Sequence, residues 1–192
     1  TFEHALDADG EESDRPLLLG LVCNEAAVTT DGPVGGNALD KALWSAPRAG
    51  AAETVAIAAA AYQRLGLLPF DHERQLASVL VNDPGGHRRV ITKGAPEVVL
   101  DRCVQIPDGA RPLLDALFSG GSRVVAVGSR SATEMTALTA DDEQGLALEG
   151  FLTFADRPRA DAGPSIAKLE RLGVEVKIIT GDNGLVAAKV CA

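Results

Sequence analysis

Cysteine and long apolar runs are scarce in this sequence, and each scarcity excludes a class of protein. The three cysteines, Cys23, Cys103 and Cys191, are odd in number and show no CxxC spacing, which argues against a disulfide framework and a zinc site. The longest apolar run, residues 55–62, is far shorter than the roughly 20 residues that span a bilayer. We therefore expect a reducing compartment and no direct membrane insertion by this chain.

Positive charge is also in deficit, because 18 lysines and arginines stand against 27 aspartates and glutamates, for a net charge of −9. This balance disfavours nucleic acid and anionic membranes as partners, since both bind clustered Lys and Arg. Hydrophobic residues make up 46% of the 192 positions, which is enough for a packed core without disulfides or metals. The composition predicts a globular chain with no nucleic-acid partner, in which local basic residues contact any anionic ligand.

The first three quarters of the sequence mix helix and strand patterns. Helices are predicted at residues 17–28, 38–46, 51–65, 96–103 and 112–119, with Asn37 as an N-cap, Gly66 as a helix end and a loop at 29–36. Strands are predicted at residues 75–82 and 88–92, which form an antiparallel hairpin around a Pro-Gly-Gly turn, and at 123–128. This pattern predicts an α+β lobe, an antiparallel sheet with flanking helices.

The pattern changes after Gly145. Residues 148–155 and 174–180 are typical of apolar strands, and residues 163–172 between them are typical of an amphipathic helix. This order predicts a βαβ unit of a parallel sheet that is covered on both faces. We therefore place a boundary near Ala147, with one domain at residues 1–147 and a second at 148–192.

Two short motifs together predict an ATP site assembled from two lobes. KGAPE at residues 93–97 offers a lysine and a Gly-Ala turn that lets a purine approach the backbone. TGDN at residues 180–183 ends an apolar strand with small and acidic residues, where an open α/β sheet receives phosphate.

Six motifs follow one another in the order found in the cytoplasmic part of P-type ATPases, the ion pumps that pass through an aspartyl-phosphate. They are GNALD at 36–40, FDHER at 70–74, KGAPE at 93–97, GSR at 121–123, DRPR at 156–159 and TGDN at 180–183. The chain resembles this family nearly end to end. PFDHER at 69–74 and GFLTFAD at 150–156 are most similar to the bacterial magnesium-transporting branch.

This resemblance implies an architecture and a set of partners. Residues 1–147 would be the nucleotide-binding (N) domain, and residues 148–192 a piece of the Rossmann-like, haloacid-dehalogenase-like phosphorylation (P) domain. The ligand would be ATP, accompanied in the parent protein by Mg²⁺ whose ligands lie largely outside this chain. The parent would be an integral protein of a bacterial cell membrane, with this part in the cytoplasm beside its phosphorylation, actuator and transmembrane domains.

The resemblance also implies roles for single residues of the nucleotide pocket. Phe70 would stack on adenine, Asp40 would accept a hydrogen bond from the adenine amino group, and Lys93 would line the pocket. Gly94 would leave room for the base, and Arg123 would reach the phosphates and help to bridge the two lobes.

Two further residues of FDHERQ, at positions 70–75, have a less definite role. Gln75 would also contact the nucleotide, but it stands where many members of the family carry a lysine or arginine, so one cationic contact of the nucleotide pocket is in doubt. His72 is a lone loop histidine, and we assign it no role.

On the phosphate side, the resemblance implies contacts from the tail. Thr180 and Gly181 would touch the transferred phosphate through a hydroxyl and a backbone amide, and Asp182 would organise the ribose or a nearby lysine. Asp156 begins the DRPR motif, in which Arg157 replaces the proline commonest in the family.

Several of these residues also have a local explanation. Arg123 could be a strand-start arginine that pairs with a nearby acid. Asp40 lies three residues after an Asn cap, where a helix amino terminus favours an acid. Phe70 could be an ordinary core residue, and Lys93 a solvated lysine at a strand end. TGDN at 180–183 could be a turn that caps a helix beginning near Leu185.

The sequence contains neither an Asp-Lys-Thr-Gly-Thr run nor a Gly-Asp-Gly motif, so the aspartyl nucleophile and magnesium carboxylates expected of the family are absent. We expect this chain to bind ATP weakly and not to hydrolyse it. One alternative is a haloacid-dehalogenase-like phosphatase fragment, which needs an Asp-x-Asp strand that does not occur before residue 148. Another is a non-catalytic interaction module, for which changing Lys93 and Phe70 would alter no ligand binding.

Overall fold

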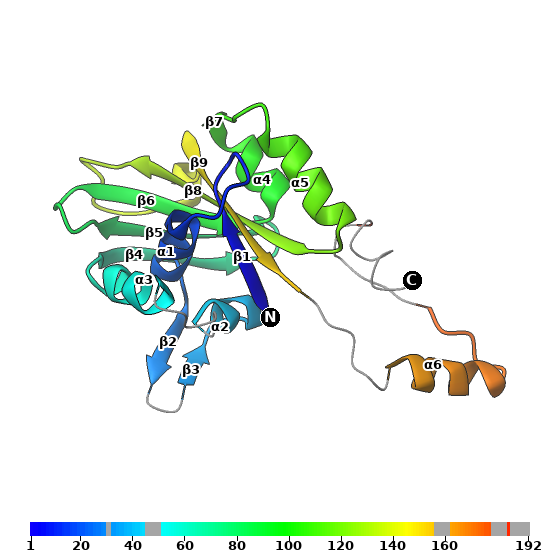
Figure 1. Cartoon of the computed structure of the whole chain (residues 1–192). Helices are drawn as coiled ribbons and strands as arrows, with labels where there is room; N and C mark the ends of the chain where they lie inside the picture. Colours follow the sequence, from blue (N-terminus) through cyan, green and yellow to red (C-terminus); the bar gives the residue numbers. More distant parts are fainter. Residues whose placement is uncertain (30–31, 45–50, 156–161, 178–183, 185–192) are drawn as a thin grey trace.

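A mostly antiparallel sheet lies at the centre of the computed structural model, which describes residues 1–29, 32–44, 51–155, 162–177 and 184 (Figure 1). Its strand order is β1-β9-β8-β6-β5-β4, and β7 pairs in parallel with β9. These strands are β1 (Phe2–Leu6), β4 (Gln63–Asp71), β5 (Leu76–Asn82), β6 (Arg88–Gly94), β7 (Cys103–Gln105), β8 (Arg123–Ser131) and β9 (Leu146–Phe154). A separate hairpin is formed by β2 (Ala26–Thr29) and β3 (Gly32–Gly35).

Helices cover both faces of the sheet. One face is covered by α1 (Asp14–Val22), α2 (Ala38–Trp44) and α3 (Ala51–Ala60), and the other by α4 (Pro96–Asp101) and α5 (Ala110–Ser119). Among the described ranges, no helix is both long and apolar enough to span a bilayer.

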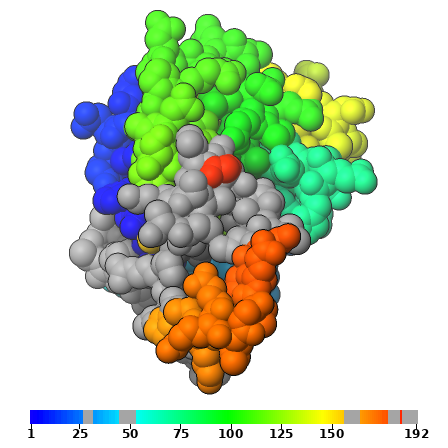
Figure 2. All heavy atoms as spheres, turned by 90° about the vertical axis from the view of Figure 1, so that its right-hand side faces the viewer, coloured from blue at the N-terminus to red at the C-terminus, as the bar shows by residue number. Residues whose placement is uncertain are grey.

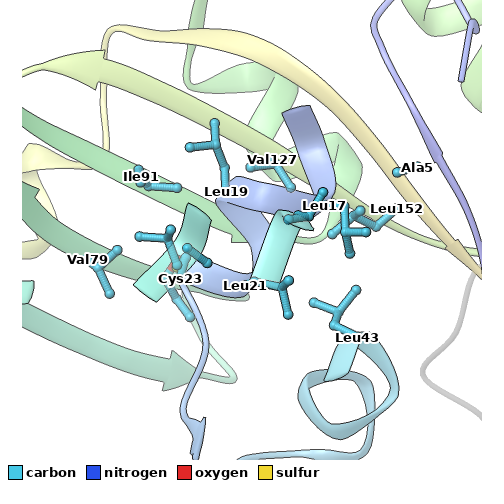
Figure 3. Close-up of a cluster of buried hydrophobic side chains, with 14 of the residues drawn as sticks. Ala5, Leu17, Leu19, Leu21, Cys23, Leu43, Val79, Ile91, Val127 and Leu152 are labelled. Carbon is cyan, nitrogen blue, oxygen red and sulfur yellow. The ribbon is translucent and has the colours of Figure 1, made fainter. Parts of the chain in front are cut away.

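The two helical layers divide the hydrophobic core, because successive residues of a strand point to opposite faces. Leu19 of α1 packs beside Ile91 and Val127 in the first core, which Figure 3 shows in close-up. Leu76 of β5 belongs to the second core, with Phe118 of α5. Since β5 is covered on both faces, its residues are nearly all buried, as in a strand at the centre of a layered domain.

Several elements agree with the sequence prediction. The hairpin of β5 and β6 is confirmed, with Ser78 opposite Thr92 in antiparallel register. The helices predicted at 96–103, 112–119 and 163–172 correspond to α4, α5 and α6 (Ala162–Arg171). The antiparallel sheet with flanking helices therefore confirms the α+β lobe.

The predicted helix at 17–28 and the loop after it are wrong in extent. Helix α1 begins at Asp14, because Ser13 Oγ accepts a hydrogen bond from Arg15 N at 3.3 Å, and it ends at Val22. Asn24 then turns the chain, since its Oδ1 accepts a 2.7 Å hydrogen bond from Ala26 N in competition with helical bonding. Strands β2 and β3 follow, where a helix end and a loop were predicted.

The helix predicted at 51–65 is too long, because α3 ends at Ala60 and β4 begins at Gln63. Gly66 does not end a helix but lies within β4, opposite Leu80 of β5. The alanine-rich run favours helix locally, whereas pairing with β5 along the sheet edge determines the structure of the residues after it.

The parallel βαβ unit predicted for the tail is not formed by the described residues. Strand β9 lies antiparallel to both β8 and β1, within the same sheet as the rest of the lobe. The proposed boundary at Ala147 consequently falls inside β9. An apolar run is expected both of a parallel strand and of a central antiparallel strand covered by helices, so the sequence pattern did not distinguish them.

Beyond β9, the structure describes only part of the predicted unit. Residues 174–177 adopt no strand, and residues 178–180 lie outside the described residues. Helix α6 lies apart from the sheet in Figure 1, and in the side view of Figure 2 it occupies the lower end of the face on which α5 lies at the upper end.

Candidate functional site

A pocket with a volume of about 850 Å³ lies where β6 passes into α4. This volume is within the range of small-molecule sites. The wall collects residues from α2, from the turn between β4 and β5, from the β6–α4 junction and from the start of β8. It includes every residue predicted to contact the nucleotide: Asp40, Phe70, Gln75, Lys93, Gly94 and Arg123.

A buried ion pair forms part of this wall. Lys93 of β6 is 7% exposed and Asp40 of α2 is 1% exposed, and the lysine Nζ donates a hydrogen bond to Asp40 Oδ1 and a second, at 3.4 Å, to the carbonyl of Gly20. The other carboxylate oxygen, Oδ2, accepts the backbone N–H of Glu25 at 3.3 Å. Both charges are therefore partnered within the protein, as burial requires, and the solvated strand-end explanation of Lys93 is wrong.

Local turn chemistry places Asp40 opposite Lys93. Asn37 Oδ1 accepts the Asp40 N–H at 2.9 Å, which confirms Asn37 as the cap of α2. Asn24 Nδ2 donates to the Asp40 carbonyl at 3.0 Å. Gly36 has a φ of +57°, and a Cβ there would lie 2.7 Å from Ala26 N, so the GNALD motif has a structural reason for its glycine and its asparagine.

Phe70 is not a core residue, because it is 41% exposed. Its ring meets the His72 ring edge to face, with centroids 5.2 Å apart and an interplanar angle of 89°. Its backbone N–H donates to Glu25 Oε1 at 2.8 Å. Core side chains do not cover this ring, so its face is available to stack on a planar ligand in the pocket.

The turn that follows Phe70 is ordered by Asp71. Its Oδ1 accepts the backbone N–H groups of Glu73 at 3.0 Å and Arg74 at 2.9 Å. These hydrogen bonds, that of Arg74 first, hold the pKa of the Asp71 carboxyl below its usual value. Gln75 then closes the turn with a φ of +57°, its N–H donating to the Asp71 carbonyl at 2.7 Å.

Gly94 has a reason in the fold that is independent of any ligand. A Cβ at this position would lie 2.1 Å from the carbonyl oxygen of Gln75 and 2.8 Å from Leu76 Cδ2. The Gln75 carbonyl accepts the Ala95 N–H at 3.1 Å, so the two chain segments approach closely across the wall. The glycine therefore permits backbone contact between the FDHERQ turn and the KGAPE motif.

Arg123 is exposed at the start of β8, opposite Phe154 of β9, and contributes a fixed positive charge to the wall. No ligand contact was predicted for other residues of the wall, among them His72, Glu97, Phe118 and the helix cap Asn37. Asn37, His72 and Glu97 lie inside the motifs that carry the predicted site, and this position could have indicated that they line the pocket. Phe118 of α5 could be recognised only as a core residue of an amphipathic helix.

Cys23 lies behind the ion pair and is not a candidate nucleophile. Its Sγ donates to the carbonyl of Ala77 at 3.4 Å, and burial raises the pKa of the thiol to about 11, so the unreactive protonated form prevails at neutral pH. Among the described residues, no three or more His, Cys, Asp or Glu side chains form a group that could hold a metal ion.

For the phosphate side, the sequence predicted contacts from Asp156 and from the TGDN motif at 180–183. Asp156, Thr180, Gly181 and Asp182 lie outside the described residues. The described pocket thus contains only residues that were predicted for the nucleotide side.

Comparison with known proteins identifies the family of this chain. The sequence profile of the family "P-type ATPase, cytoplasmic domain N" matches residues 13–161. The chain is 35% identical to "Magnesium-transporting ATPase, P-type 1" of Salmonella typhimurium, over 99% of this chain and 22% of that protein. It is 36% identical to the Escherichia coli K12 protein of the same name, over 69% of this chain and 16% of the relative.

"Calcium-transporting ATPase 1" of Lactococcus lactis is 29% identical, over 95% of this chain and 22% of its own length. The chain therefore spans about a fifth of the length of these relatives. The resemblance predicted from the six motifs, including the similarity to bacterial magnesium-transporting members, is confirmed. This chain belongs to the P-type ATPase family and comprises its cytoplasmic domain N.

Proposed function

We propose that this chain is the ATP-binding cytoplasmic domain of a bacterial cation-transporting P-type ATPase, a magnesium transporter. The whole protein would couple ATP hydrolysis to ion transport through an aspartyl-phosphate. The observation that carries the proposal is a single pocket that collects Phe70, Lys93 and Arg123 from three separate motifs.

The chemistry of the wall suits a nucleotide. The exposed ring of Phe70 offers a stacking face to the purine, worth about 1 kcal/mol beyond burial. The Lys93–Asp40 pair supplies a fixed polar surface, and Arg123 offers a guanidinium that suits phosphate oxygens. Gln75 lines the same wall with an uncharged amide.

Magnesium would enter this pocket on the nucleotide rather than on the protein. The described residues contain no cluster of acidic side chains suited to the ion. In nucleotide sites, Mg²⁺ is bound mainly by the phosphates and by water, with only one or two carboxylates from the protein. Since the sequence lacks the aspartyl nucleophile motif, we infer that the chain binds ATP without hydrolysing it. Asp156, Thr180, Gly181 and Asp182 would act on the phosphate side in the parent pump.

We further propose that the nucleotide-binding lobe ends after Phe154 rather than at Ala147. Strand β9 is the partner of both β1 and β8, so a cut at Ala147 would remove a central strand. Residues from 155 onward would then begin the phosphorylation domain.

An NMR titration of the chain with ATP and, separately, with GTP tests the proposal. Backbone shifts should cluster at Asp40, Phe70 and Lys93. Phe70→Ala should weaken ATP binding about fivefold, because about 1 kcal/mol of stacking is lost. Leu67→Ala is the matched control, since Leu67 lies on the same strand with similar exposure and outside the pocket wall.

Two outcomes would refute the proposal. An absence of shifts at millimolar ATP would favour the interaction module. Shifts that leave the pocket wall unaffected, with Phe70→Ala binding ATP as well as Leu67→Ala does, would place any nucleotide elsewhere.

A further inference from the structure

A second carboxylate is buried on the sheet face opposite Lys93. Ser78 and Thr92 face each other across β5 and β6, one residue along from the pair Ala77 and Lys93, so the two pairs point to opposite faces. Glu143 lies over the Ser78–Thr92 pair and is 1% exposed. Its Oε1 accepts a hydrogen bond from Ser78 Oγ at 2.7 Å, and Ser78 Oγ lies 2.9 Å from Thr92 Oγ1.

The same carboxylate oxygen also accepts a hydrogen bond from Arg74 Nη1. Arg74 belongs to the turn between β4 and β5, which lies between two residues of the pocket wall, Phe70 near the end of β4 and Gln75. Its second terminal nitrogen, Nη2, donates to the carbonyl of Pro69 at 2.9 Å. One guanidinium therefore connects the buried Glu143 to the residue immediately before Phe70.

Independent contacts hold the segment that carries Glu143. Thr139 and Asp142 form a capping box around the short 3₁₀ helix η1 (Ala140–Asp142). Arg130 Nε donates to the Asp142 carbonyl at 3.1 Å, and Leu146 N donates to the Arg102 carbonyl at 3.0 Å. Glu143 is thus a fixed hydrogen-bond acceptor at the sheet, and the turn between β4 and β5 contacts it through Arg74.

The Phe70 ring depends on such support because core packing does not hold it. The ring is 41% exposed, and its ring contact is with His72 of the adjacent turn. Its orientation therefore follows the backbone at the end of β4. Glu25 holds that backbone at the Phe70 N–H, and Arg74 holds it at Pro69 through its side chain and at Asp71 through its own N–H. A planar guanidinium with several donors is suited to holding two acceptors at once.

We propose that Glu143 is a positioning residue for the nucleotide pocket, which through Arg74 sets the turn that presents Phe70 to the ligand. This inference rests on the proposed function, because it assigns Phe70 to ligand stacking. Glu143 itself does not line the pocket. If Glu143 loses its negative charge, the inward orientation of Arg74 is less stable. The turn then becomes more mobile, while the sheet beneath it keeps its structure.

Glu143→Gln tests the inference, with Glu149→Gln as the matched control. Glu149 of β9 is also a mostly buried acid that accepts hydrogen bonds from Arg15, Arg89 and a serine, but it lies outside the pocket wall. Glu143→Gln should weaken ATP binding about fivefold, close to the effect of losing Phe70 stacking. It should also speed hydrogen exchange at the Phe70 amide, and Glu149→Gln should do neither.

Two further variants separate positioning from general destabilisation. Glu143→Gln should cost no additional ATP affinity in a Phe70→Ala background. Arg74→Lys keeps a positive charge opposite Glu143 but lacks the fork that also reaches Pro69, and it should reproduce the loss of affinity even if Glu143→Gln folds poorly.

The failures are distinguishable. If the unaltered chain binds no ATP, the proposed function is refuted, and with it the role of Glu143 in the nucleotide pocket. If the chain binds ATP through Phe70 but Glu143→Gln and Arg74→Lys bind as Glu149→Gln does, the positioning role alone is refuted.

Discussion

The two faces of the β5–β6 hairpin each bury a carboxylate, and the two are partnered differently. Asp40 has both oxygens occupied, Oδ1 by Lys93 and Oδ2 by the Glu25 N–H. Glu143 accepts from Arg74 and Ser78 through Oε1, while its Oε2 has no hydrogen-bond partner among the described residues. The first carboxylate is fully satisfied inside the pocket wall, and the second is half satisfied beneath a loop.

The cationic partners differ as well. Lys93 is enclosed by the protein, whereas the Arg74 side chain is 23% exposed at a turn. Removing the acid costs less free energy when the remaining cation can be hydrated than when the cation stays buried without a counter-charge. Asp40 therefore mainly secures the interior of the pocket wall, while Glu143 transmits order from the sheet to a surface turn.

Asp40→Asn should have the largest effect on this comparison. It leaves the Lys93 ammonium buried without a counter-charge, which should lower the free energy of unfolding by about 3 kcal/mol. Urea denaturation followed by circular dichroism measures this loss. The double variant Asp40→Leu, Lys93→Met should regain much of it, and a cost for Asp40→Asn below about 1 kcal/mol would show that the pair is not buried as described.

Glu143→Gln should have a smaller effect on stability. The amide keeps an acceptor for Ser78, and Arg74 can turn toward water, so a loss of about 1 to 2 kcal/mol in the free energy of unfolding is expected. The same denaturation experiment compares the two isosteric changes directly. Equal losses for Asp40→Asn and Glu143→Gln would remove the distinction between the two faces.

Glu149 provides the smallest expected effect, through pH. Burial acts to raise the pKa of this carboxyl, but hydrogen bonds from Arg15 and Ser129 outweigh it and hold the pKa below the ordinary value of 4.5. A group whose pKa is lowered by folding stabilises the folded state above its ordinary pKa, and this contribution is lost as the pH falls through the folded-state value.

The stability advantage of the unaltered chain over Glu149→Gln should therefore be constant near neutral pH and shrink below about 4.5. Urea midpoints of both proteins measured from pH 7 to pH 3 test this. Because Arg15 is partly exposed, the advantage should be smaller than the effect of either buried acid and should decrease in high salt. An advantage that grows on acidification would contradict the assigned direction.

Much of the pocket could be predicted from residues that are close in sequence. The hairpin of β5 and β6 follows from β-branched runs around Asp83-Pro84-Gly85-Gly86, and this hairpin brings Gln75 beside Gly94. The order of the six motifs predicted that Asp40, Phe70 and Lys93 belong to one site, and the structure brings them to one wall. Their role toward ATP stays a prediction.

Glu143 had no comparable signal. It follows Asp141 and Asp142 in a polar run that is typical of a solvated loop. Only the capping box at Thr139 and the crossing of this loop over β5 and β6 decide that the third acid of the run is the buried one.

The helix cap at Asn37 follows from the sequence, because turn chemistry depends on residues near one another along the chain. The family and the membership of the pocket also follow from the sequence, because the ordered motifs resemble those of P-type ATPases. The tertiary structure alone decided the place of β9, which pairs with β1 from the far end of the lobe, Phe2 lying opposite Phe154. Apolar patterning shows that a strand is covered on both faces but not which strands lie beside it. The tertiary structure also decided which acids are buried. The cost of burying a carboxylate depends on partners such as Lys93 and Arg74, which folding brings from other strands and turns.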